Sequence, residues 1–458
     1  MNISKLTYAV AMAMMMLIAL PSCDKDDNNE TEGIVDPDNY TARNEAAIEA
    51  ATISKKVAFP NFGSISQVLY SDKFNAFAAK VAKFANDAAV KIGVNKDKNT
   101  AVSPISIFMA LAMSAECANG DTRQELLDAM GVTYDELRAN IQALCYTFNQ
   151  VFGMDDGTNK NLIKCVNSLW VNKVITNAMK DDGIKALNSY YHSDLMKMDF
   201  ETTDVNEIIK SYLSNETNGL LQPKFDYDAE TLILLMNVIY LREIWNEDGN
   251  DLPLTDDKYD FLCYDKSKVN TQLLQGYYNY GRAVETEKFR KFMTKTNRGL
   301  QLTFFVPKDG YTLDDIYTSD VLNDLTPYVG KDEAAKKWYY TRCFFPEFEA
   351  EYNEDVKEAI KGMGVDKFFT DGACDLTNLT DYPVVCTKIN HVSKLEVARK
   401  GIEGAAVTIV EFSNSASGGP YEDEWETVYE DFIVDRNFAY VLSMKDVPVF
   451  TGVVKAIK

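Results

Sequence analysis

The sequence predicts an α+β fold, in which helices fill the first part of the chain and strands most of the rest. Between residues 74 and 85, apolar side chains recur at the spacing of one helical face. Residues 232–236 are instead apolar without interruption, which is typical of a strand buried on both sides. No internal repeat is visible. Early helices followed mainly by strands indicate an α+β architecture.

Further elements are predicted from capping and breaking residues. Ser103 and Pro104 precede an apolar helical run, and proline is favoured in the first turn of a helix. Gly219 ends another run, since glycine is common just after a helix. The predicted helices are 74–85, 105–117, 122–130, 206–218 and 353–364. The predicted strands are 231–241, 300–306, 384–389, 395–398 and 438–443.

The first residues are predicted to be a targeting segment. Lys5 precedes an apolar run at 6–20, which is shorter than the roughly 20 residues that a membrane-spanning helix needs. The run ends in Leu-Pro-Ser-Cys, which resembles a bacterial lipoprotein signal. We therefore expect a signal peptide at 1–22 and a lipid on Cys23 that anchors the chain to a membrane. The alternative is an ordinary secretory signal followed by a chance cysteine.

The segment after Cys23 is strongly acidic. Residues 24–45 hold eight acids and two bases, which is typical of a flexible chain, and we predict a tether over 23–65. Acidic residues directly after a lipidated cysteine resemble the surface-export signals of some Gram-negative anaerobes, and the alternative is a solvated spacer. The expected location is the outer membrane of a Gram-negative bacterium, with the protein lipid-anchored at the cell surface.

Composition and motifs disfavour several classes of function. Among 458 residues, 47 Lys and Arg stand against 69 Asp and Glu, and the net charge of −22 argues against a nucleic-acid partner. The chain has two histidines, which disfavours multi-histidine metal sites and most histidine-dependent hydrolases. Phosphate-loop, dinucleotide, zinc-hydrolase and nucleophile-elbow motifs do not occur, so neither an enzyme nor a cofactor is expected. A glycosidase-type carboxylate pair stays open, because its members need not be close in sequence.

A series of short motifs resembles the serpin family in content and order. The motifs are 99–107 (NTAVSPISI), 118–122, 166–171 (VNSLWV), 215–219, 235–240, 345–348 (FPEF), 364–368, 373–376, 435–438 and 450–454. His391 also precedes Gly401 by ten residues, the spacing found in that family. Each motif alone is weak, but their number and order over residues 70–458 identify the chain as a member of the serpin family.

The resemblance implies one domain at 66–458, although length alone suggests two or three domains of roughly 150 residues. The implied fold has three β-sheets, about nine helices and an exposed reactive-centre loop at about 401–431. Serpins offer this loop as bait, and the protease serine forms an acyl-enzyme with it. The cut loop then inserts into the main sheet as a new strand, and the distorted protease stays trapped. The implied partner is a target protease, and the expected state is a monomer.

The residues after Gly401 fit an inserting strand with two exceptions. Alternate residues on one side carry no charge: Ile402, Gly404, Ala406, Thr408, Val410 and Phe412. By resemblance the hinge consists of Gly401, Ile402, Glu403, Gly404, Ala405, Ala406 and Thr408. The family usually has a smaller Thr or Ser at 402 and an Ala at 404, and overpacking by the larger Ile402 would cost about 1–3 kcal/mol and slow insertion. A non-inhibitory serpin cleaved as a substrate is therefore the alternative, and a surface lipoprotein that binds glycan or protein is a more distant one.

Counting the usual family distance from the hinge glycine places the reactive bond at Ser415–Ala416. A serine before this bond favours elastase-like or subtilisin-like proteases, which have shallow pockets. Residues 401–435 contain no Lys or Arg, which disfavours a trypsin-like target. The loop is longer than usual, so Phe412 or Tyr421 facing a chymotrypsin-like protease remains an alternative.

Other residues match structural positions of the family. By resemblance, Ser103, Ser106, Asn237 and His391 belong to the polar cluster that holds the main sheet closed, and Trp245 lies at the opening where insertion begins. Residues 422–431 hold six acids and no base. This charge would either steer a basic protease or keep an exposed loop soluble.

Overall fold

The computed structural model describes most of the chain from residue 41 onward and confirms the α+β class. The described residues are 41–62, 65–94, 97–151, 162–201, 204–217, 219, 230–245, 250–297, 299–324, 330–404, 425–444 and 447–458. They belong to one compact unit, Val35–Lys458. The predicted signal peptide, Cys23 and the bait segment at 405–424 lie outside the described residues.

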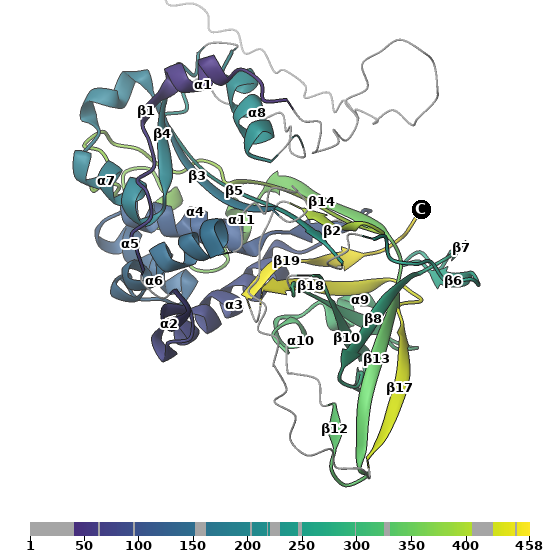
Figure 1. Ribbon diagram of the computed structural model, residues 1–458. Helices are drawn as coiled ribbons and strands as arrows, with labels where there is room; N and C mark the ends of the chain where they lie inside the picture. The colour runs from purple at the N-terminus through teal and green to yellow at the C-terminus, as the bar shows by residue number, and fades with distance from the viewer. Residues whose placement is uncertain are drawn as a thin grey trace, which may run out of the picture. The chain divides into compact units, whose positions relative to one another are not determined.

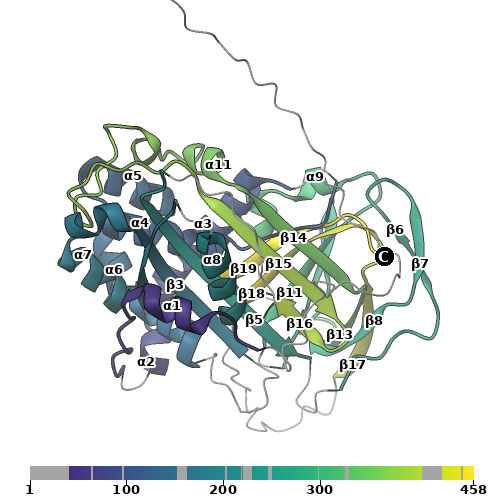
Figure 2. The same cartoon turned by 90° about the horizontal axis from the view of Figure 1, so that it is seen from above.

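Thirteen strands form one continuous sheet, in the order β1-β4-β3-β5-β16-β15-β14-β2-β19-β18-β11-β10-β9. Its central strands are β3 (Leu162–Asn172), β5 (Ile233–Ile244), β16 (Gly401–Gly404), β15 (Asn390–Ala398) and β14 (Phe348–Asp355). The others are β1 (Thr52–Ser54), β2 (Thr100–Val102), β4 (Ser193–Met198), β9 (Val284–Glu285), β10 (Phe289–Lys295), β11 (Gln301–Pro307), β18 (Phe438–Met444) and β19 (Val447–Val454). The central strands pair antiparallel from β3 to β14, and Figure 2 shows β5, β16, β15 and β14 side by side.

Two smaller sheets complete the strands of the described residues. The first consists of β8 (Leu274–Tyr280), β12 (Lys331–Asp332), β13 (Lys337–Phe345) and β17 (Glu426–Ile433). Strand β13 pairs antiparallel with β8 and β12 on one side and parallel with β17 on the other. The last sheet is the hairpin of β6 (Tyr259–Leu262) and β7 (Lys268–Thr271). The three sheets implied by the resemblance are therefore present in this part of the chain.

Helices cover both faces of β3 and β5. Helix α4 (Pro104–Cys117) is buried almost all round because it is apolar on nearly every side. On the opposite face of the sheet, Trp170 packs edge-on against Tyr212 of α8 (Asp204–Glu216), at 5.2 Å between ring centroids. Figure 1 shows α4 and α6 on one side of these strands and α8 on the other.

The remaining helices are as follows. The α-helices are α1 (Glu45–Ala51), α2 (Ile65–Leu69), α3 (Asp72–Ile92), α5 (Gly120–Met130), α6 (Tyr134–Tyr146), α7 (Asp181–Tyr190), α9 (Leu313–Ile316), α10 (Ser319–Leu322) and α11 (Lys357–Lys361). Short 3-10 or π segments lie at Thr147–Val151, Lys173–Ala178 and Lys367–Phe369. The described residues thus hold more helical segments than the nine expected, because several of them are single turns.

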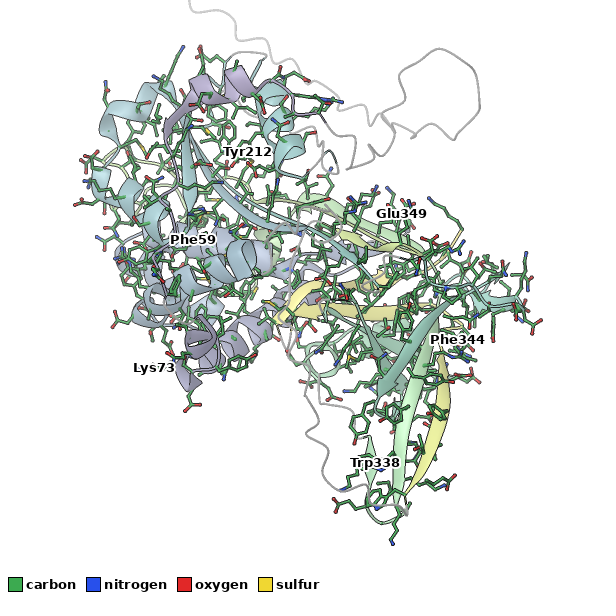
Figure 3. All side chains as sticks on the ribbon, viewed as in Figure 1. Phe59, Lys73, Tyr212, Trp338, Phe344 and Glu349 are labelled. Carbon is green, nitrogen blue, oxygen red and sulfur yellow. The ribbon has the colours of Figure 1, made fainter. Side chains whose placement is uncertain are left out.

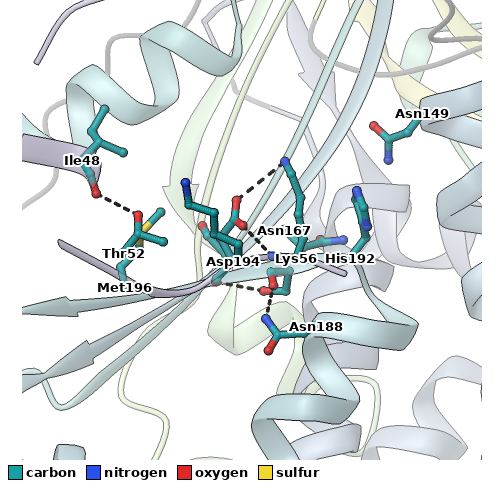
Figure 4. Close-up of polar contacts among 12 residues, drawn as sticks. Ile48, Thr52, Lys56, Asn149, Asn167, Asn188, His192, Asp194 and Met196 are labelled. Carbon is teal, nitrogen blue, oxygen red and sulfur yellow. Dashed lines mark hydrogen bonds and ion pairs between the residues drawn. The ribbon is translucent and has the colours of Figure 1, made fainter. Parts of the chain in front are cut away.

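The predicted tether runs to residue 65, but folded structure begins earlier. Helix α1 buries Ala51, and β1 pairs with β4 at the edge of the main sheet. Figure 4 shows the polar contacts of this segment, in which the Lys56 amide donates to Asp194 Oδ1 at 2.8 Å. Ile48 and Ala51 give residues 45–51 an apolar face that the acidic residues before them lack. The end of the tether is therefore corrected to a position before Glu45.

Two predicted elements are wrong. The predicted helix at 353–364 begins as strand, because β14 continues to Asp355, opposite Asn390 of β15. Helix α11 is confined to Lys357–Lys361. The predicted strand at 384–389 is irregular chain, since β14 ends opposite Asn390 and offers no partner before that residue.

Candidate functional site

The predicted hinge begins as a strand inside the main sheet. Gly401–Gly404 form β16, which lies between β15 and β5 and pairs antiparallel with both. Ile402 lies opposite Val397 on one side and Glu243 on the other. At this end, therefore, the centre of the sheet already contains an additional strand made of hinge residues.

The turn into β16 is fixed by close packing and hydrogen bonds. A Cβ atom at Gly401 would overlap the carbonyl oxygen of Glu243, so glycine is required there. The buried indole of Trp245 donates from Nε1 to the Ala398 carbonyl at 2.7 Å. The Arg399 amide donates to the Glu347 carboxylate at 2.8 Å. These contacts hold the chain reversal between β15 and β16 and place Trp245 beside it.

The side chains of β16 alternate between the core and the outer face of the sheet. Ile402 is 1% exposed and belongs to the main hydrophobic core. The structure thus accommodates the larger side chain that the sequence places at this position, and its size does not keep Gly401–Gly404 out of the sheet. Glu403 points the other way and accepts a hydrogen bond of 3.0 Å from the Tyr240 hydroxyl. Burial raises the pKa of the Glu403 carboxyl above its usual value.

Three carboxylates lie in register across neighbouring strands on this outer face. Glu403 of β16 is opposite Glu396 of β15, which is opposite Glu349 of β14. Burial, and next the charge of Glu349, raise the pKa of Glu396. Positive charge lies at both ends, since Arg242 of β5 is opposite Glu403, and Lys458 pairs with Glu349 (labelled in Figure 3) at 3.1 Å. Sequence alternation assigns each acid to an outward position, but only strand register brings them together.

Beyond Gly404, β5 and β15 are connected through helix α4. The Ser103 amide donates to His391 Nε2 of β15 at 3.0 Å, and Ser106 Oγ donates to the Asn237 carbonyl of β5 at 3.3 Å. No backbone pairing joins β5 to β15 anywhere along these two strands, both of which are described throughout. The four predicted polar residues are thus gathered around the start of α4, on both sides of the position that a longer β16 would occupy.

His391 is a neutral hydrogen-bond acceptor in this cluster. Its Nε2 accepts the Ser103 amide proton, so the ring proton is on Nδ1. Burial lowers its pKa to about 4. The ring therefore carries no charge at neutral pH and acts as a structural group, as the resemblance implies.

The rest of the predicted site lies outside the described residues. These positions are Ala405, Ala406, Thr408, the bond Ser415–Ala416 and the lipidation site Cys23. Within the described part of the chain, no group of His, Cys, Asp and Glu side chains is arranged to hold a metal ion. None of the helices described there is long and apolar enough to span a membrane.

Comparison with known proteins identifies the family. A family profile described as "Serpin (serine protease inhibitor)" matches residues 73–456. The chain therefore belongs to the serpin family, which is described as a family of protease inhibitors and not of enzymes. Human neuroserpin is 26% identical over 396 residues, which cover 79% of this chain and 88% of neuroserpin. Iripin-1 of Ixodes ricinus is 25% identical, with 69% and 79% of the two chains covered.

Solved serpin structures share the fold. Serpin48 of Tenebrio molitor has a TM-score of 0.67 at 19% identity, and the match covers 85% of this chain and all of that one. The thermophilic serpin tengpin in its native state has a TM-score of 0.65 at 17% identity, with 90% of this chain and 98% of tengpin covered. The serpin fold is thereby confirmed.

Proposed function

We propose that this serpin is a suicide inhibitor of serine endopeptidases, which traps its target by inserting the cleaved loop into the main sheet. The supporting observation is β16, which is already seated between β15 and β5. Insertion of the remaining loop would extend this strand past Gly404 toward His391 and Asn237. Each added residue would gain pairing on both sides and would bury alternate uncharged side chains.

The proposed covalent step uses the protease's own catalytic groups. The protease serine Oγ attacks the Ser415 carbonyl carbon and forms an ester, while the peptide bond to Ala416 breaks. The Ala416 nitrogen takes up a proton and leaves as a new amino terminus. Hydrolysis of the ester would release the protease, so inhibition requires that loop insertion and the resulting distortion of the protease come first.

The proposed targets are elastase-like or subtilisin-like proteases, and cysteine proteases of similar preference are included. A serine before the bond suits a shallow pocket, and the lack of Lys and Arg over 401–435 disfavours trypsin-like enzymes. Acidic residues at 422–431 support attraction of a basic protease.

The test mixes residues 24–458 with pancreatic elastase, subtilisin, chymotrypsin, trypsin and papain. With elastase or subtilisin, we expect a covalent complex that survives denaturing electrophoresis. The released fragment should have the mass of residues 416–458. Cleavage that leaves the protease fully active would overturn the inhibitory proposal in favour of a substrate-type serpin. Cleaved protein should also unfold at a markedly higher temperature than intact protein, because the inserted strand adds pairing and burial.

We further propose that Cys23 carries a lipid and anchors the protein at the outer membrane, facing the cell surface. The support is the apolar run ending in Leu-Pro-Ser-Cys and the acidic residues that follow. Labelled fatty acid should be incorporated by the full chain and by a Cys386→Ser control, but not by Cys23→Ser. Equal labelling of all three would exclude lipidation at Cys23. If protease added to intact cells does not digest the protein, surface exposure is contradicted.

A further inference from the structure

The outer face of the second sheet carries a concentration of aromatic side chains. On β13, Tyr339, Thr341 and Cys343 are buried, and Trp338 and Tyr340 alternate with them on the other side. Strand register places Tyr280 of β8 and Tyr429 of β17 on either side of Tyr340, and Tyr278 beside Arg342. Trp425 packs on Trp338 just before β17 begins. We call the six residues Trp338, Trp425, Tyr278, Tyr280, Tyr340 and Tyr429 the aromatic face; Figure 3 labels Trp338.

The rings of the aromatic face contact one another in an unbroken series. The centroid distances are 5.3 Å for Trp425–Trp338, 5.9 Å for Trp338–Tyr280, 5.6 Å for Tyr280–Tyr340, 6.0 Å for Tyr340–Tyr429 and 5.0 Å for Tyr429–Tyr278. Gly330 backs onto the Tyr280 ring, where a Cβ would clash, so this ring is held in place. Mutual contact leaves the side chains little rotamer entropy to lose on binding.

Three members of the aromatic face are exposed although their rings are large, and the other three are half-buried. Tyr429 is 63% exposed, Tyr280 47% and Tyr278 43%. Cations and an acid lie among the rings: Lys331 lies over both tryptophans, and Arg342 lies over Tyr278 and pairs with Asp431 at 3.2 Å. Exposed aromatic residues together with arginine are the types that dominate binding at protein interfaces. A contiguous exposed patch of this kind marks an interaction surface.

Chain connectivity indicates which partner the aromatic face meets. Trp425 follows Ala416, the residue after the proposed reactive bond, by nine residues. Nine residues span at most about 32 Å when fully extended. A protease of about 230 residues is about 45 Å across by the size scaling of compact domains. A protease that holds the bond in its active site is therefore larger than the stretch of chain that joins this bond to the aromatic face.

We propose that the aromatic face is a docking surface for the target protease, which contacts it in the first, noncovalent complex. This inference rests on the proposed inhibitory function and adds to it a second contact besides the bait loop. The acids of β17 at this surface, Glu426, Glu430 and Asp431, each form an ion pair with a neighbouring base: Lys337, Arg282 and Arg342. The rings, and not a net charge, would therefore carry the contact.

The docking surface should affect formation of the first, noncovalent complex but not the later insertion of the loop. Two linked contacts bind more tightly than the loop alone, so the second-order rate constant of inhibition should depend on the rings. Once the ester has formed, the protease moves away with the inserting strand. The stoichiometry of inhibition, which reports the competition between insertion and ester hydrolysis, should then be independent of the rings.

The test measures both quantities with the protease that forms the covalent complex in the panel above. Tyr278→Ser and Tyr429→Ser, alone and together, replace exposed rings by a small polar side chain. The matched control is Tyr382→Ser, since Tyr382 is 46% exposed and belongs to another surface segment. We expect the double variant to lose about tenfold in the second-order rate constant, as for removal of interface hot spots, with unchanged stoichiometry and unfolding temperature. The control should keep the wild-type rate.

The other outcomes are distinguishable. Unchanged rates in the double variant, with a covalent complex still formed, would overturn the docking surface and leave the inhibitory function intact. A wild-type chain that forms no complex with any protease would refute both proposals. If sedimentation shows a dimer that the double variant abolishes, with no change in rate, the surface is a self-association face and the proposal is wrong.

Discussion

The Tyr240 hydroxyl donates a hydrogen bond of 3.0 Å to the Glu403 carboxylate and so ties the hinge strand to β5 across the outer face of the sheet. On the inner face, Ile402 is anchored in the core. The start of the loop is therefore held by a polar contact on one side and an apolar contact on the other, and each can be changed separately.

Glu403→Gln should stabilise the seated hinge at neutral pH. Burial raises the pKa of Glu403 in the folded state above its unfolded value, so the folded protein binds more protons between these two values. Stability from this group is present at low pH and is lost as pH rises through the folded pKa. The unfolding temperature of the variant should exceed that of wild type at pH 7.5, and this difference should shrink toward pH 4.5.

Glu358→Gln is the control for this experiment, because Glu358 is an exposed glutamate on α11, away from the row of carboxylates. Its unfolding temperature should follow wild type across the same pH range. If the difference in unfolding temperature between Glu403→Gln and wild type stays constant with pH, the charge of Glu403 does not destabilise the fold as proposed.

Ile402→Arg should abolish the proposed inhibition and leave the loop as a substrate. A guanidinium at this position would have to be buried in the apolar core without a partner, which opposes seating of the strand by several kcal/mol. Cleavage of the loop should continue while the covalent complex disappears, as seen by denaturing electrophoresis. Ile53→Arg, at a residue 45% exposed, should leave the complex unchanged.

Gly401→Ala should destabilise the intact protein by about 2 kcal/mol or more, since its Cβ would overlap the Glu243 carbonyl oxygen. The drop in unfolding free energy is measured by urea titration. In Gly310→Ala the new Cβ meets open space, and the loss should be about 1 kcal/mol from backbone strain alone. Equal losses in the two variants would argue that the hinge is not held against β5.

Stability should fall as the pH is lowered from about 6.5 to about 4 because His391 stays neutral in the fold. The unfolded chain takes up a proton in this window and the folded chain does not, which corresponds to about 3 kcal/mol at most. His391→Gln should flatten this part of the pH–stability curve. With two histidines in the chain, NMR titration can assign the low pKa directly, and an ordinary value for both would contradict the geometry.

The sequence predicted elements whose signal is local. Helical spacing at 74–85 lies within α3, and the uninterrupted apolar run at 232–236 lies within β5 except for its first residue. Residues 353–364 were mispredicted because pairing with β15 overrides the helical pattern as far as Asp355. Pairing with a strand many residues away cannot be predicted from the local periodicity of apolar residues.

The site was predictable in its residues and not in its arrangement. The resemblance located Ser103 and His391, but their direct hydrogen bond depends on where α4 crosses the sheet. The seating of β16 and the alignment of Glu403 with Glu396 follow from strand register, which no single segment encodes. The aromatic face had a local signal in the alternation of Trp338 and Tyr340, whereas its completion by Tyr429 required parallel pairing with β17.

Both edge strands of the thirteen-stranded sheet are short. Strand β1 has three residues and an irregular register, and β9 has two residues. Short, irregular margins give another chain little backbone to pair with. Neighbouring molecules at high concentration would therefore find poor templates at either margin of the sheet. In the proposed mechanism, the sheet instead grows by one strand in its interior, and the inserting segment belongs to the same chain.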